Sequence, residues 1–310
     1  MHMKKEILGL KKRQTEKKNG KDGLRMKLQY NKDKWQLCEP EYLNTIQFFI
    51  TNKCNRRCKG CFYASSLDNK THMTFDKYIN ILNNYLPQIQ KVVLIGGEPT
   101  LSPHLSDMIV YNQKHNLTTT IYTNGYKLDC LRNIDLYNVK VRIGILDLKR
   151  GEKALIDVDK VKFPVFIVQM LRQDNIHEVM DIASYAEENF NCSDFMLSSI
   201  RDIEVTKSFW EDTEETISNE KYAEIVQNFL NEYDGNMNIH ISRRGVFEGN
   251  KHIYRCRFFN FFPNKTQGII CPLDISLQLY DDPEKYSFQQ RKCNKHSECI
   301  LQKLVLKRRQ

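Results

Sequence analysis

Short apolar runs rich in β-branched and aromatic residues alternate with segments of helical period from about residue 45 onward. This alternation is typical of parallel βα architectures, in which a helix returns the chain to the same edge of the sheet after each strand. The pattern predicts six strands, within residues 46–51, 91–97, 118–125, 140–148, 163–171 and 194–200. Six units are too few to close an eight-stranded barrel, so we predict an open, curved sheet of the α/β class: a partial (β/α)6 TIM-like barrel with a small cysteine-rich C-terminal extension.

The segments on either side of this alternating region differ from it in composition. Residues 1–34 contain 12 Lys or Arg against 4 Asp or Glu, which is most of the net charge of +9. We interpret residues 1–44 as a basic, solvated N-terminal arm, with contacts to nucleic acid or to an acidic peptide as the alternatives. Residues 45–235 are the predicted barrel core. Residues 236–310 are the predicted extension, connected by a helix near 220–233 and a strand at 237–242.

The chain has no run of eighteen apolar residues and no apolar stretch near its start. We therefore expect a cytoplasmic protein without a membrane partner. In a reducing compartment its ten cysteines are better explained as metal ligands or small buried residues than as disulfides. Seven of them fall into two groups, which are Cys54, Cys58 and Cys61, and Cys256, Cys271, Cys293 and Cys299.

The first group has the spacing C-x3-C-x2-C directly after the first predicted strand, with no fourth cysteine nearby. Thiolates hold iron–sulfur clusters, and three thiolates on a four-iron cluster leave one iron without a protein ligand. A zinc knuckle or three buried thiols are the alternatives, but structural zinc sites prefer four ligands in paired short spacings. The spacing therefore favours a cluster with one open iron.

On these residues the chain resembles the radical S-adenosylmethionine (radical SAM) enzymes, whose signature is C-x3-C-x2-C on the loop after the first barrel strand. The resemblance implies a 4Fe-4S cluster at Cys54, Cys58 and Cys61, with S-adenosylmethionine bound through its amino and carboxylate groups to the open iron. The stretch GGEP after the second strand resembles the family's second motif, which binds the methionine ammonium, at Gly96, Gly97, Glu98 and Pro99. The likeness extends over about residues 45–200.

Further cofactor contacts follow from the same resemblance and from strand position. Asn124 lies in a TNG stretch that ends the third strand as in many members, and Asn175 matches a family position after the fifth strand. We assign Asp147 and Gln169 to cofactor binding from their positions near strand ends alone. The aromatic residue that the family places before the third cysteine is replaced by Gly60, so no side chain is assigned to adenine stacking. No residue is assigned as a catalytic acid, base or radical relay.

The second group has the order C-x14-C-x21-C-x5-C. Cys256 and Cys271 flank a predicted hairpin whose turn is PNKTQG, and the aromatic run 258–262 is interpreted as the core around it. This arrangement resembles the auxiliary-cluster (SPASM/twitch-like) extension of radical SAM enzymes and implies a second 4Fe-4S cluster. A structural zinc site, with His296 in place of one thiol, is the alternative.

The resemblance implies a reaction in which an electron donor such as flavodoxin or ferredoxin reduces the cluster. S-adenosylmethionine is then cleaved to a 5'-deoxyadenosyl radical that abstracts hydrogen from a substrate. We favour a ribosomally made peptide that is crosslinked, epimerised or oxidised. One alternative is a dehydrogenase or cyclase that acts on a small molecule such as a sugar, nucleoside or amino acid. A nucleic-acid-binding metal protein is the least favoured reading, because only the basic arm suggests it.

Overall fold

The computed structural model describes residues 25–26, 28–38, 43–58, 61, 63, 67–146, 148, 163–199, 216–242, 247–248, 254–255, 258–261, 292–293 and 303–309. Its centre is a run of seven neighbouring strands, each parallel to the next. They are β3 (Thr45–Thr51), β4 (Lys91–Gly96), β5 (Thr118–Thr123), β6 (Val139–Ile145), β7 (Val165–Leu171), β8 (Cys192–Ser199) and β9 (Asn238–Ser242). The predicted α/β fold with a partial parallel barrel is confirmed.

The sheet continues beyond the six predicted strands at both sides. Strand β9 was expected as a connection to the extension, but it pairs in parallel with β8. Beyond β9 follow β14 (Lys303–Arg308) and β2 (Trp35–Cys38), each antiparallel to its neighbour. At the opposite side β12 (Phe258–Phe261) pairs in parallel with β3. The sheet of ten strands thus ends in β12 and β2, and it does not close.

The predicted hairpin around residues 256–271 stays a prediction, because most of it lies outside the described residues. Strand β12, in its first arm, pairs along one edge with β3, which the sequence did not predict. Two further short pairs are antiparallel: β1 (Arg25–Met26) with β10 (Phe247–Glu248), and β11 (Tyr254–Arg255) with β13 (Lys292–Cys293). The large sheet therefore includes strands from all three predicted segments, whose boundaries stay a prediction.

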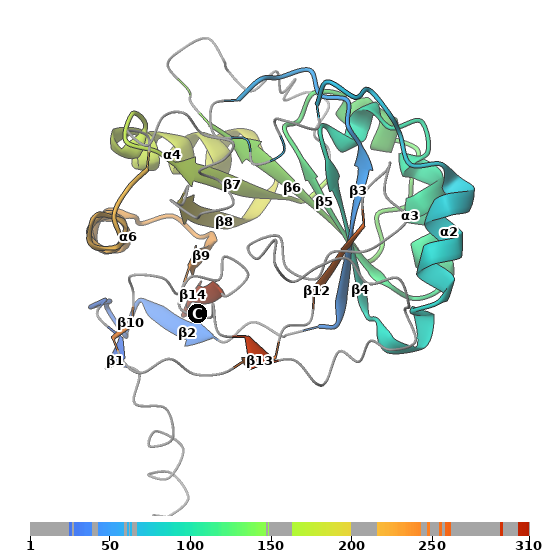
Figure 1. Cartoon of the computed structure of the whole chain (residues 1–310). Coiled ribbons are helices and arrows are strands. Elements are labelled where there is room, and N and C mark those ends of the chain that lie inside the picture. The colour runs from blue at the N-terminus through green and yellow to red at the C-terminus, as the bar shows by residue number, and fades with distance from the viewer. Residues whose placement is uncertain are drawn as a thin grey trace, which may run out of the picture.

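Helices cover the outer face of the curved sheet, as Figure 1 shows: α2 and α3 lie outside β3 and β4, and α4 and α6 lie beside β7 to β9. Their bounds are α2 Phe75–Asn83, α3 Leu105–Lys114, α4 Val179–Asn189 and α6 Asn219–Glu232. Short 3-10 turns are η2 Leu86–Gln88, η3 Pro99–Leu101, η4 Leu128–Leu131 and η6 Ile176–Glu178. No helix in these ranges is long and apolar enough to cross a membrane.

The sequence predicts helix N-caps at Thr74 and, before Pro103, at Ser102, and the two predictions have different outcomes. Thr74 caps α2 as expected, because its hydroxyl accepts a hydrogen bond from the Lys77 amide at 3.3 Å. The predicted cap of α3 at Ser102 is wrong, since the cap residue is His104. The turn η3 occupies the chain up to Leu101, and the Ser102 amide closes this turn by donating to the Pro99 carbonyl. The helix therefore begins at Leu105.

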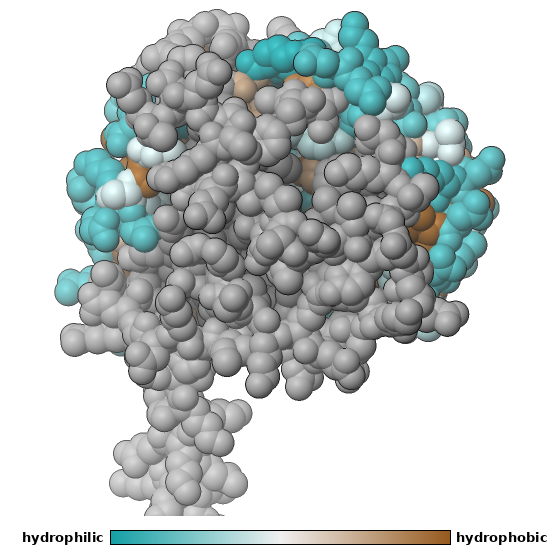
Figure 2. All heavy atoms as spheres, in the orientation of Figure 1, coloured by the Kyte–Doolittle hydropathy of each residue, from teal (hydrophilic) through white to brown (hydrophobic). Residues whose placement is uncertain are grey.

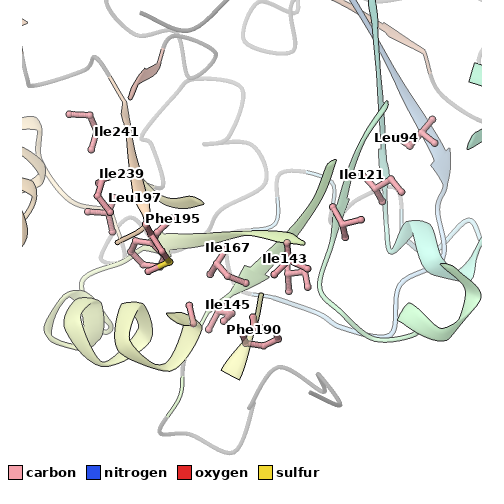
Figure 3. Packing of buried hydrophobic residues seen from close by; sticks show 14 of the residues in the cluster. Leu94, Ile121, Ile143, Ile145, Ile167, Phe190, Phe195, Leu197, Ile239 and Ile241 are labelled. Atoms are coloured by element: carbon pink, nitrogen blue, oxygen red, sulfur yellow. The ribbon is translucent and has the colours of Figure 1, made fainter. Parts of the chain in front are cut away.

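The main hydrophobic core lies between the sheet and these helices. Alternate residues of each strand point to this side, as expected for a period of two. Figure 3 shows this row from strand to strand, at Leu94, Ile121, Ile143, Ile145, Ile167, Phe195, Leu197, Ile239 and Ile241. All of these side chains are fully buried. The described surface visible in Figure 2 is mainly hydrophilic, which fits one core enclosed beneath a polar exterior.

Candidate functional site

The three cysteines of the first group lie on the loop that follows β3, at the carboxyl edge of the sheet. All three are half-buried, and the Cys61 amide donates to the Cys58 carbonyl at 3.2 Å. Burial raises the pKa of Cys54, and it raises the pKa of Cys61 to about 11. The neighbouring cysteines raise both pKa values further. A metal that binds here must therefore displace protons.

This donor set fits an iron–sulfur cluster. Within the described ranges no three His, Cys, Asp or Glu side chains converge as they would on a single metal ion. In a four-iron cluster each thiolate binds a different iron, so its ligands stand farther apart than the ligands of one ion. The Arg56 amide also donates to the Cys54 sulfur at 3.4 Å, which would stabilise a thiolate. Three free thiols match a cluster with one open iron better than a closed tetrahedral zinc site.

Gly96, which ends β4, and Gly97, which follows it, allow the main chain to meet the cysteine loop. The Gly97 amide donates to the Thr51 carbonyl and the Glu98 amide to the Lys53 carbonyl, both at 2.7 Å. A Cβ atom would lie 2.4 Å from the Thr51 oxygen at Gly96 and 2.1 Å from the Lys53 oxygen at Gly97. The close approach of the two main chains therefore requires glycine at both positions.

Glu98 is 1% exposed, and protein donors surround its carboxylate. Oxygen Oε1 accepts from the Thr100 amide at 3.1 Å, the Thr100 hydroxyl at 2.7 Å and the Thr123 hydroxyl at 2.5 Å. Oxygen Oε2 accepts from the Asn124 amide at 2.7 Å. Burial raises the pKa of Glu98, and these four donors oppose that shift. The carboxylate thus connects η3, which begins at the buried Pro99, to the end of β5. Oxygen Oε2 accepts one of these hydrogen bonds and can accept one more.

Asn124 connects this arrangement to the cysteine loop. Its side-chain amide donates to Asn55 Oδ1 at 2.9 Å, and the same nitrogen lies 4.0 Å from the Cys54 sulfur. The structure therefore brings together the cysteine loop, the GGEP stretch and Asn124, which the sequence had predicted separately.

The other predicted cofactor residues lie differently. Gln169 pairs in register between Ile145 and Leu197, both of the main core, so its side chain faces the helices rather than the barrel interior. It is fully buried, and within the described part of the chain neither polar atom of its amide has a hydrogen-bond partner. Asp147 lies outside the described residues. The cofactor roles of both residues stay predictions.

Asn175 holds two strand ends together. Its side-chain amide donates to the Leu146 and Met170 carbonyls, both at 2.9 Å, and its oxygen accepts from the Arg172 amide at 2.8 Å. The residue is 1% exposed. Its buried side chain therefore holds the carboxyl ends of β6 and β7 together.

A small apolar cluster supports the cysteine loop from inside the barrel. Tyr63 stacks on Phe49 with ring centroids 4.8 Å apart, and Leu67, Cys54 and Cys61 pack against the pair. The Tyr63 hydroxyl donates to Asn52 Oδ1. Because Tyr63 is 4% exposed, it is a packing residue and not a free surface for adenine. Gly60 and Phe62 lie outside the described residues.

A basic pocket beside Cys54 was not predicted from the sequence. Lys53, Arg57 and Lys70 line it together with Leu67 and Leu101, and its volume is about 170 Å³. Arg57 and Lys70 are exposed, and Lys53 is half-buried. The sequence signal is the run of basic residues within TNKCNRRCKG. The three cations give this rim of the site a positive potential that suits an acidic partner.

Of the second cysteine group, Cys293 lies in β13, where it is the register partner of Tyr254 in β11. Cys256, Cys271, Cys299 and His296 lie outside the described residues. The main chain at Cys293 thus lies beside the strand that directly precedes Cys256 in the sequence.

An open parallel barrel whose cysteine loop meets a glycine-rich turn at the carboxyl edge defines a class of iron–sulfur enzyme. In agreement, residues 48–198 match the model of the Radical SAM superfamily. Residues 48–198, just under half of the chain, therefore form a Radical SAM domain, the domain of an enzyme superfamily.

Relatives of several activities are similar to parts of the chain. An S-adenosylmethionine-dependent nucleotide dehydratase of Flammeovirga pacifica is 33% identical over 90 residues, which cover 27% of this chain and 31% of the relative. A GTP 3',8-cyclase of Clostridium perfringens is 30% identical over 174 residues, which cover 47% of this chain and 53% of the relative. The chain thus spans about half or less of the length of these curated relatives.

Among solved structures, Streptococcus suis SuiB bound to its precursor peptide SuiA matches with a TM-score of 0.60. The match covers 85% of this chain and 64% of SuiB, at 12% sequence identity. SuiB bound to S-adenosylmethionine matches with a TM-score of 0.57 over 83% of this chain. At these identities the likeness shows the fold.

Proposed function

We propose that this enzyme reductively cleaves S-adenosylmethionine at a 4Fe-4S cluster and abstracts hydrogen from a bound substrate. The observation that carries the proposal is the position of three free thiols, Cys54, Cys58 and Cys61, on a loop whose main chain is hydrogen-bonded to the GGEP stretch. When bound, the cluster and S-adenosylmethionine supply a 5'-deoxyadenosyl radical. The protein supplies the position of both and a site closed to water.

The chain's own groups have distinct parts in this proposal. The three thiolates hold three irons, and the Arg56 amide stabilises charge on the Cys54 sulfur. The buried Glu98 carboxylate holds the end of β5, so that the Asn124 amide stays against the cysteine loop. Phe49, Tyr63 and Leu67 exclude water from the inner side of the loop. None of these groups needs to move for the cofactor to bind.

We propose a ribosomally made peptide as the substrate. The fold likeness to SuiB, a structure solved with its precursor peptide, supports this choice, as does the cysteine-rich C-terminal sequence. A small-molecule substrate is the second candidate, since relatives named as a nucleotide dehydratase and a GTP 3',8-cyclase match 27% to 50% of this chain, over at most 180 residues. The test is the mass of a candidate peptide after turnover, with 5'-deoxyadenosine formed in equal amount. Unchanged peptide mass during cofactor cleavage would favour the small molecule.

Two further parts belong to the proposal. Cys256, Cys271, Cys293 and Cys299 hold a second 4Fe-4S cluster, with zinc as the alternative, and the β11 to β13 pairing is consistent with one site for them. The basic pocket at Lys53, Arg57 and Lys70 receives an acidic electron donor such as flavodoxin or ferredoxin. Iron and zinc content per chain separates the two metals. The cytoplasmic location stays an expectation.

A further inference from the structure

A row of polar and aromatic residues crosses the barrel interior. One residue from each of five neighbouring strands lies in register, namely Tyr122, Arg142, Phe166, Asp194 and Asn238. In β5 to β9 these residues alternate with core residues such as Ile143 and Ile167, which face the helices (Figure 3). The row therefore faces the barrel interior.

Arg142 brings a positive charge into this interior without a negative partner. Its guanidinium lies 4.1 Å from the centre of the Phe166 ring and 5.2 Å from that of Tyr122. Nη1 donates to the Tyr122 hydroxyl at 2.6 Å, and Nε is buried without a hydrogen-bond partner among the described residues. No carboxylate in the described part of the chain forms an ion pair with it.

The carboxylate in the same row, Asp194, is already compensated. It accepts from the Ser193 hydroxyl at 2.6 Å and from the Asn238 amide at 3.3 Å, and His240 Nε2 lies 2.6 Å from it. The His240 ring packs on the other aromatic contact of Arg142, Phe166, at 4.4 Å between centroids. The charge of the guanidinium is therefore the uncompensated charge of this layer.

Above Arg142, toward the carboxyl edge, the same face of β6 carries no side chain at its next position, because that residue is Gly144. Gly144 lies two residues farther along β6 on the same face, and among the described residues a Cβ atom there would meet the Thr123 oxygen alone, at 3.8 Å. Tyr122, Arg142 and Gly144 are half-buried, whereas the helix-facing Ile143 and Ile145 are fully buried. Tyr122 precedes Asn124 by two residues, so Arg142 lies roughly 7 Å below the level of the cysteine loop.

We propose that Arg142 binds an anionic group of the substrate, a carboxylate or a phosphate, inside the barrel. Stacking between the two rings fixes the plane of the guanidinium, and its free N–H groups can donate to two oxygens of one anion. Because Gly144 has no side chain, the anionic group can reach Arg142 from the carboxyl edge of the barrel. The inference rests on the proposed function, and it adds a chemical requirement to the substrate.

The test is anion binding by the full-length, anaerobically reconstituted enzyme, measured by calorimetry. The probes are inorganic pyrophosphate for the phosphate and glutarate for the carboxylate. We compare wild type with Arg142→Gln, which removes the charge, and Gly144→Val, which keeps the arginine and fills the path. Arg132→Gln, on the exposed surface, is the matched control for loss of one charge.

We expect one of the two probes to bind to wild type and to Arg132→Gln alike. Affinity should fall by about tenfold or more in Arg142→Gln, as for a lost charge-assisted hydrogen bond, and comparably in Gly144→Val. The probe that binds identifies the anion as phosphate or carboxylate. Equal binding by wild type and Arg142→Gln, or no binding of either probe to wild type, would overturn the inference.

Formation of 5'-deoxyadenosine by wild type is measured separately, without either probe. Its absence would refute the proposed function, whereas the dependence of probe binding on Arg142 tests the anion site alone. The two failures are therefore distinguishable. Circular dichroism of each variant confirms that a loss of binding does not result from unfolding.

Discussion

Replacement of Glu98 tests whether its buried carboxylate holds the edge of the barrel together. In Glu98→Ala four donors lose their acceptor. The two hydroxyls can rotate, but the amides of Thr100 and Asn124 stay in place. Each unsatisfied buried N–H costs about 1–3 kcal/mol, so we expect a loss of about 4 kcal/mol in the free energy of unfolding.

The more conservative Glu98→Gln should cost less. Its oxygen can keep the three donors at the Oε1 position, while its NH2 group faces the Asn124 amide and loses that bond. The expected loss is about 2 kcal/mol. Because Asn124 is then released, we also expect less iron to be retained in Glu98→Gln than in the exposed control Glu188→Gln.

The assay is urea unfolding under anaerobic conditions, with the midpoint and slope fitted for each variant. The expected order of stability is wild type and Glu188→Gln first, then Glu98→Gln, then Glu98→Ala. A Glu98→Gln protein as stable as wild type would refute the reasoning. It would mean that the cost of burying the charge, which raises the pKa of Glu98, cancels the benefit of its hydrogen bonds.

Three further predictions concern other parts of the molecule. Gly97→Ala should lower iron content and cofactor cleavage together, since its Cβ atom would lie 2.1 Å from the Lys53 oxygen; wild-type iron content would contradict this. Burial opposes the ionisation of Asp194, but hydrogen bonds from His240 and other donors outweigh it and lower the pKa of Asp194 from 3.8 to about 2. Asp194 therefore stabilises the fold above pH 3.8, and this contribution is lost as the pH falls toward 2. Asp194→Asn should cost about 2 kcal/mol at pH 7 and little near pH 2, as measured by urea unfolding of the apoprotein; an equal cost at both values would exclude this linkage. Lys70→Glu should slow turnover with flavodoxin at low salt but not with dithionite, and an equal effect on both reductants would argue against donor docking at the basic pocket.

The sequence was sufficient for features that depend on local pattern. Strand periodicity located β3 to β8, Thr74 was identified as a helix cap, and the spacing of Cys54, Cys58 and Cys61 indicated the cofactor. These features depend on neighbouring residues, whose side-chain periods and short spacings are visible directly.

The features that were missed depend on contacts between distant segments. Strand β12 follows its partner β3 by more than 200 residues, and nothing in its composition distinguishes a barrel edge from a hairpin arm. Strand β9 has the same alternation in either role. From the sequence alone Gly97 is indistinguishable from an ordinary turn glycine, and the structure is needed to show that the cysteine loop packs against it. The sequence does not show that Arg142 faces the interior of the barrel, because this depends on the direction in which the sheet curves.

The most direct test of the account compares wild type with the triple variant Cys54→Ala, Cys58→Ala, Cys61→Ala after anaerobic reconstitution. Iron and acid-labile sulfide are counted per chain, and 5'-deoxyadenosine is followed after addition of S-adenosylmethionine and dithionite. The account predicts that the variant loses about four irons per chain and all cofactor cleavage. Cleavage of S-adenosylmethionine by the variant at the wild-type rate would contradict it.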